Sequence, residues 1–122
     1  MTCKEIGKDF LNLCACGNPK KAFELYIHKN FKHHNAYFKG DANSLMTAMD
    51  ESAKQNPNRV FEIKNIIEED DKIVFHSFIK QSNNDLGMAV IHILKFSENK
   101  IIEMWDLAQP IPENLVNENG MF

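Results

Sequence analysis

The sequence predicts a single α+β domain in which N-terminal helices pack on a curved antiparallel sheet that encloses an apolar pocket. Up to about residue 56, apolar residues recur at the 3.6-residue period of a helix. From Val60 onward they follow the period of 2 that is typical of strands. The chain has 122 residues, which suits one domain, residues 1–122, with a core that needs no disulfide or metal for stability.

Three helices are predicted before the change of period. The first begins with a capping box formed by Thr2 and Glu5. The second covers residues 19–27 and has a proline in its first turn, where a missing N–H costs nothing. Asp41 is suited to cap the third helix. Between the second and third helices, residues 31–40 are predicted to form a loop.

Four strands follow, and their apolar residues lie on both faces. They are predicted at residues 60–68, 72–81, 86–97 and 100–109. In the third strand, Val90 and Leu94 alternate with Ile91 and Ile93, whereas a sheet with one wet face would alternate apolar and polar residues. The helices can cover only one face, so the other face is a candidate interface for a homodimer formed through the sheet.

Three polar residues, His76, His92 and Asp106, occur within these apolar strands. If the turn before the third strand centres on Asn84, His76 and His92 lie on one face. If the last turn is a three-residue loop with Asn99 in the left-handed conformation, His92 and Asp106 also share a face. A carboxylate and imidazoles converging in an apolar cavity can transfer protons. The alternative is that each histidine is a hydrogen-bonded residue of the core.

Composition and charge exclude several classes of function. The net charge is −3 and the lysines are interleaved with acids, so we expect no nucleic-acid partner. No apolar run approaches the length of a membrane span, and no apolar stretch follows a basic start, so we expect neither a membrane partner nor a signal peptide. Three cysteines near the N-terminus are typical of a reducing compartment, which predicts a cytoplasmic location.

No metal or cofactor is expected. Four histidines (His33, His34, His76 and His92) are candidate metal ligands because imidazole binds zinc or iron, but none of the familiar ligand spacings is present. The sequence also has no glycine-rich phosphate loop and no nucleophile elbow.

Several segments resemble the SnoaL-like polyketide cyclase group of the nuclear transport factor 2-like superfamily. They are Tyr26-Ile27, the loop Phe31-Lys32-His33-His34-Asn35, and the run from Lys100 to Trp105-Asp106 with Gln109-Pro110. The resemblance covers nearly the whole chain and implies a cone-shaped half barrel, usually dimeric, with a deep apolar pocket. The chain differs from the family pattern at His92, where relatives often carry an acidic residue.

The resemblance implies that Asp106 is the acid/base residue and that His34 matches a histidine at the pocket rim. We therefore expect Asp106, His34 and His76 to act on a small, largely apolar carbonyl compound, in cyclase, isomerase or aldol-type chemistry. Contacts to the ligand are expected from His92, Trp105, Asn35 and Tyr26. Two alternatives are a non-catalytic domain that binds a small ligand and an interaction domain whose cavity is incidental.

Overall fold

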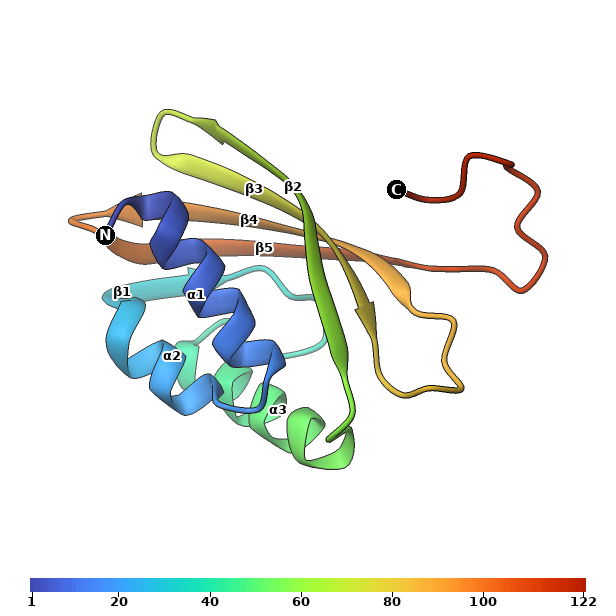
Figure 1. Cartoon of the computed structure of the whole chain (residues 1–122). Coiled ribbons are helices and arrows are strands. Elements are labelled where there is room, and N and C mark those ends of the chain that lie inside the picture. Colours follow the sequence, from blue (N-terminus) through green and yellow to red (C-terminus); the bar gives the residue numbers. More distant parts are fainter.

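The computed structural model describes residues 1–122 and has three helices packed against one face of a five-stranded sheet (Figure 1). The elements, in chain order, are α1 (Cys3–Ala15), α2 (Pro19–Tyr26), β1 (Ile27–His33), α3 (Ala42–Gln55), β2 (Val60–Glu69), β3 (Lys72–Lys80), β4 (Met88–Ser97) and β5 (Lys100–Pro110). The sheet is strongly curved but does not close into a barrel (Figure 1). The predicted α+β architecture is therefore confirmed.

The sheet is mixed rather than purely antiparallel. Its strands are ordered β1-β5-β4-β3-β2, and β1 runs parallel to β5 while every other neighbouring pair is antiparallel. Strand β1 is not among the predicted elements, because the sequence places Ile27 in the second helix and residues 31–33 in a loop. As an edge strand β1 buries only Phe31 and His33, so its period-2 pattern is too short to identify.

The predicted helix starts are confirmed. Thr2 Oγ1 accepts a hydrogen bond from the Glu5 backbone N–H (3.2 Å), and Glu5 Oε1 accepts one from the Thr2 N–H (3.0 Å). Asp41 Oδ2 accepts from the Ser44 N–H at 2.9 Å. Each contact satisfies a helical N–H that has no partner within its own helix. None of the three helices is both long enough and apolar enough to cross a membrane.

The main core lies between α1, α2 and the inner, helix-facing side of the sheet. Phe75 of β3, Leu94 of β4 and Met104 of β5 are fully buried there against Phe10 of α1. The close approach of α1 depends on Gly7, because a Cβ atom at this position would lie 2.4 Å from Cζ of Phe75. Residue 7 thus fixes the distance between the first helix and the sheet.

Replacing Gly7 with alanine is expected to destabilise the protein, although alanine favours helices more than glycine does. The added methyl group overlaps the Phe75 ring, and overpacking of this kind typically costs about 1–3 kcal/mol. Urea denaturation followed by circular dichroism measures the change in unfolding free energy. Lys8→Ala, on the exposed side of the same helix, is the control and should change it by less than about 0.5 kcal/mol. A Gly7→Ala variant as stable as this control would show that α1 is free to shift.

Candidate functional site

The pairing of β3 with β4 separates two of the histidines singled out from the sequence. Phe75 is opposite His92, and His76 is opposite Ile91. Directly paired residues project to the same face, so His92 lies on the inner face and His76 on the outer face. The expectation that they share a face was wrong. The centre of the turn lies between Asn83 and Asn84 rather than on Asn84, so His92 pairs with Phe75 instead of His76.

The pairing of β4 with β5 confirms that His92 and Asp106 share a face, since the two residues are directly opposite each other. The turn and the strand pairing that produce this arrangement differ from those expected. The turn has two residues, Glu98 and Asn99, both with positive φ, and Ile102 has no partner on β4. This β-bulge at Ile102 supplies the extra residue that the sequence analysis had placed in the turn.

Asp106 and His92 line a cavity of about 700 Å³ between the inner face of the sheet and the helices. We call it the inner cavity. Of the 23 residues that line it, 15 are hydrophobic, so it is suited to a ligand with a largely apolar body. Its polar residues come from two regions: residues 34–35 with His92 and Asp106, and Ser52 with Arg59 and Gln81.

The carboxylate of Asp106 is held from one side and approached from the other. Asn35 Nδ2 donates a hydrogen bond to Oδ2 at 2.9 Å, while Nε2 of His92 lies 4.0 Å from Oδ1. The Asp106 side chain retains only 19% of its accessible surface, and the His92 side chain only 13%. Oδ1 therefore faces an imidazole that lies beyond hydrogen-bond distance.

The loop that carries Asn35 is ordered by His33, a residue to which the sequence analysis gave no role beyond that of a discarded metal ligand. Nδ1 of His33 accepts a hydrogen bond from the Asn35 N–H at 3.1 Å, and its Nε2 lies 2.5 Å from the Lys39 carbonyl oxygen. The amide oxygen of Asn35 accepts from the Tyr37 N–H at 3.0 Å. His33 thus joins both ends of the loop and leaves the Asn35 amide group directed at Asp106.

The side chain of His34 contacts residues on the outer face of β5. Its ring stacks on Trp105, with centroids 5.1 Å apart, and its Nε2 lies 2.6 Å from Glu103 Oε2. Residues 103 and 105 alternate with Asp106 along the strand, so they project to the outer face. His34 contributes to the wall of the inner cavity, but its Nε2 is committed to Glu103 rather than to Asp106. Trp105 does not line this cavity.

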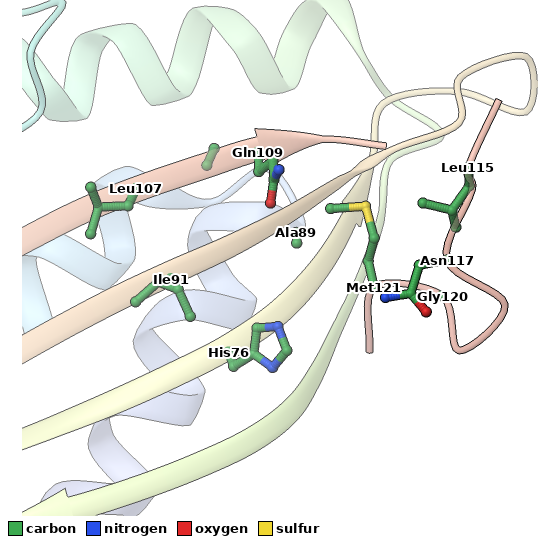
Figure 2. Close-up of a pocket in the computed structure, with 10 residues that line it drawn as sticks. His76, Ala89, Ile91, Leu107, Gln109, Leu115, Asn117, Gly120 and Met121 are labelled. Atoms are coloured by element: carbon green, nitrogen blue, oxygen red, sulfur yellow. The ribbon is translucent and has the colours of Figure 1, made fainter. Parts of the chain in front are cut away.

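Tyr26 and His76 also lie outside the inner cavity. The hydroxyl group of Tyr26 donates a hydrogen bond to Asp9 of α1. His76 lies 2.9 Å from the Asn65 amide nitrogen and stacks on Phe122, with ring centroids 5.4 Å apart. It lines a second, more open pocket of about 510 Å³ on the outer face, which we call the outer groove (Figure 2). Residues 115–121 of the C-terminal segment form the far wall of this groove (Figure 2).

No group of three or more histidine, cysteine, aspartate or glutamate side chains converges closely enough to hold a metal ion. The four histidines that were weighed as ligands are distributed over β1, the following loop and both faces of the sheet.

Comparison with solved structures identifies the architecture, whereas the sequence matches no protein-family model and no curated protein. A candidate polyketide cyclase from Bacillus cereus ATCC 10987 superposes with a TM-score of 0.74 at 22% identity, over 85% of this chain and 72% of that one. A nuclear transport factor 2-like protein of unknown function from Cytophaga hutchinsonii gives a TM-score of 0.73 at 13% identity, over 90% and 92%. The chain has the nuclear transport factor 2-like fold.

A SnoaL-like candidate polyketide cyclase from Jannaschia also shares this nuclear transport factor 2-like fold, with a TM-score of 0.70 at 10% identity, over 87% of this chain and 86% of that one. The resemblance inferred from the sequence is thus confirmed at the level of the fold. In this chain the inner cavity lies between the sheet and the helices, and β4 and β5 supply its neighbouring residues His92 and Asp106.

Burial sets the protonation of His92. Desolvation lowers the pKa of its imidazole below the usual 6.5, and the negative charge of Asp106 opposes this effect only in part. The ring is therefore neutral at pH 7. Its Nδ1 is buried without a hydrogen-bond partner, as is Oγ of Ser77 on the neighbouring strand. A neutral imidazole with unused hydrogen-bonding capacity can accept or donate a proton to a ligand.

The lowered pKa of His92 predicts a loss of stability in mild acid. When the pH falls below about 6.5, the unfolded chain takes up a proton at His92 that the folded chain does not bind, so the unfolded state is favoured. The unfolding free energy should therefore decrease from pH 7 to pH 5.5, as measured by urea denaturation. In His92→Gln this decrease should be smaller. His28→Gln, on β1 and outside the inner cavity, is the matched control and should keep the wild-type slope. Equal slopes in wild type and His92→Gln would contradict the assignment.

Proposed function

We propose that the chain binds a small, largely apolar carbonyl compound in the inner cavity and transfers a proton to or from it through Asp106 and His92. The observation that carries this proposal is the Asp106 carboxylate, held by Asn35 at 2.9 Å beside a neutral imidazole in a mainly hydrophobic cavity. Three of the structural neighbours are described as candidate polyketide cyclases, which supports carbonyl chemistry.

The proposed step is removal of a proton from the carbon next to the carbonyl group. Oδ1 of Asp106 carries no hydrogen bond from the protein and is the base. The electron pair of the broken C–H bond moves into the carbonyl group, so negative charge develops on the substrate oxygen. Asn35 Nδ2 has one N–H on Asp106 and a second N–H available, and a neutral His92 can also donate. Either group can stabilise the developing oxyanion, after which the proton returns to carbon or oxygen.

The roles proposed for the histidines follow from their positions. His92 takes the place that the sequence analysis had given to His76, because only His92 faces Asp106. His34 contributes to the wall of the cavity beside Asn35 and fixes the start of the loop, since its backbone N–H donates to the Met104 carbonyl oxygen at 2.9 Å. Trp105 supports the His34 ring from the outer face.

Asp106→Asn is expected to abolish proton transfer without unfolding the protein. The asparagine keeps the shape of the side chain and an oxygen that can accept from Asn35, but it cannot act as a base. Exchange of the α-protons of an apolar cyclic ketone, such as 2-tetralone, into deuterated water can be followed by NMR. We expect the exchange rate to fall by about 100-fold or more, while the thermal midpoint stays within about 3 °C of wild type.

Asp70→Asn is the matched control for this variant. Asp70 lies in the exposed turn between β2 and β3 with φ of 55°, a conformation that asparagine also adopts readily. The Asp70→Asn variant should leave both the exchange rate and the thermal midpoint unchanged. Ketone binding without exchange in the wild type would support a non-catalytic binding domain instead. A lower melting temperature with unchanged exchange in Asp106→Asn would assign Asp106 a structural role.

We also propose that the chain forms a homodimer through the outer face of the sheet. Leu107 on β5 keeps 59% of its surface exposed, and it borders the outer groove together with Ile91 of β4. An exposed apolar patch on a sheet is typical of a protein interface. Leu115, Asn117, Gly120 and Met121 of the C-terminal segment line the same groove, so the proposed interface includes them (Figure 2).

Sedimentation velocity at micromolar concentration should show a dimer for the wild-type protein. Leu107→Lys should shift the equilibrium toward the monomer, because each partner would bury an unpaired ammonium group. Leu25→Lys provides a control on the helical side of the molecule, where Leu25 is 43% exposed. A monomeric wild type at these concentrations would overturn the proposal.

A further inference from the structure

The only arginine of the sequence lines the inner cavity at the end away from Asp106. Arg59 directly precedes β2, where Val60 pairs with Lys80, and its Nε donates to Gln81 at the end of β3. Across the sheet, Asp106 of β5 is level with Phe75 of β3, because both residues pair with His92 of β4. Gln81 lies six positions after Phe75, which corresponds to roughly 20 Å along a strand. The inner cavity therefore has a polar group near each end.

The guanidinium group of Arg59 has neutral partners only. Nε donates to Gln81 Oε1 at 2.8 Å, and Nη2 donates to Ser52 Oγ at 2.6 Å. No carboxylate of the chain forms an ion pair with it. A guanidinium group has five N–H donors, so three of them have no acceptor in the protein.

A partly buried positive charge without a counter-ion is costly, and proteins usually pair such a charge. Desolvation of Arg59 lowers its pKa below the usual value, and no nearby acid offsets this effect. Ser52 and Gln81 fix the orientation of the planar group from α3 and β3, so its remaining donors are held in place. A fixed guanidinium group with free N–H donors is suited to bind a carboxylate through two hydrogen bonds.

We propose that Arg59 is a specificity-determining residue that binds an anionic oxygen group, such as a carboxylate, at the far end of the ligand. The apolar body of the ligand fills the cavity between Arg59 and Asp106, which makes the ligand an apolar keto acid rather than a neutral ketone. This inference rests on the proposed function, because it requires the inner cavity to bind a ligand.

Arg59 also joins α3 to β3, and a purely structural role would need no ligand. The two roles are separated by a pair of fluorescent probes that share an aromatic body and differ by one anionic group. These probes are 8-anilinonaphthalene-1-sulfonate, which is anionic, and N-phenyl-1-naphthylamine, which is the same aromatic body without the sulfonate group. A structural role predicts that loss of Arg59 weakens binding of both probes alike.

The dissociation constants of both probes are measured by fluorescence titration for wild type, Arg59→Gln, Arg59→Lys and Lys20→Gln. Lys20 is exposed on α2, so Lys20→Gln removes the same net charge away from the cavity. Arg59→Gln should weaken binding of the anionic probe about tenfold or more and change binding of the neutral probe by less than about twofold. Arg59→Lys should restore part of the affinity for the anionic probe, and Lys20→Gln should match the wild type.

Equal effects of Arg59→Gln on the two probes, or no effect on either, would overturn the role of Arg59. In that case, continued binding of the neutral probe and competition of that probe with 2-tetralone would leave the proposed function intact. Failure of both probes and of 2-tetralone to bind the wild-type protein would instead reject ligand binding by the inner cavity, and both proposals with it.

Discussion

One irregularity in the sheet, the β-bulge at Ile102, decides which side chains of β5 face the helices. The two-residue turn at Glu98 and Asn99 would, in a regular ladder, place Trp105 opposite His92. The unpaired residue shifts the pairing by one, and Asp106 takes that position instead. The pairing of His92 with Asp106, the contact from Asn35 and the stack of His34 on Trp105 all depend on this shift.

The sequence was sufficient to predict elements whose signals are local. The helix starts at Thr2 and Asp41 follow from side chains that bond to N–H groups three residues away, and the structure contains both contacts. The four long strands were found because each carries enough alternating apolar residues to identify its period. The edge strand β1 was missed because it has mainly polar residues and pairs with β5, about 70 positions further along the chain.

The relative positions of the site residues were only partly predictable, because strand register depends on turn geometry rather than on composition. Between β3 and β4, Asp85 accepts from the N–H groups of Gln81 and Gly87, and Gly87 adopts a φ of 94°. These contacts set the register of β3 against β4. The polar residues 82–85 predict a turn, but they do not indicate whether its centre falls on a residue or between two residues. Between β4 and β5, the expected face was correct although the expected turn was not. The contact of Asn35 with Asp106 joins residues 71 positions apart and has no local pattern.

The tight packing of α1 on the sheet makes the walls of the inner cavity unequal. Gly7 holds the backbone of α1 close against Phe75. The same helix supplies Leu11, Cys14 and Ala15 to the wall of the inner cavity, so this wall is fixed against the sheet. A second wall comes from α3, which has only two buried residues, Leu45 and Ala53, and presents Met49 to the cavity. Methionine is unbranched and adapts its shape at low energetic cost. A ligand of the kind proposed would thus be accommodated on the α3 side, while His92 and Asp106 keep the spacing that the pairing of β4 with β5 fixes.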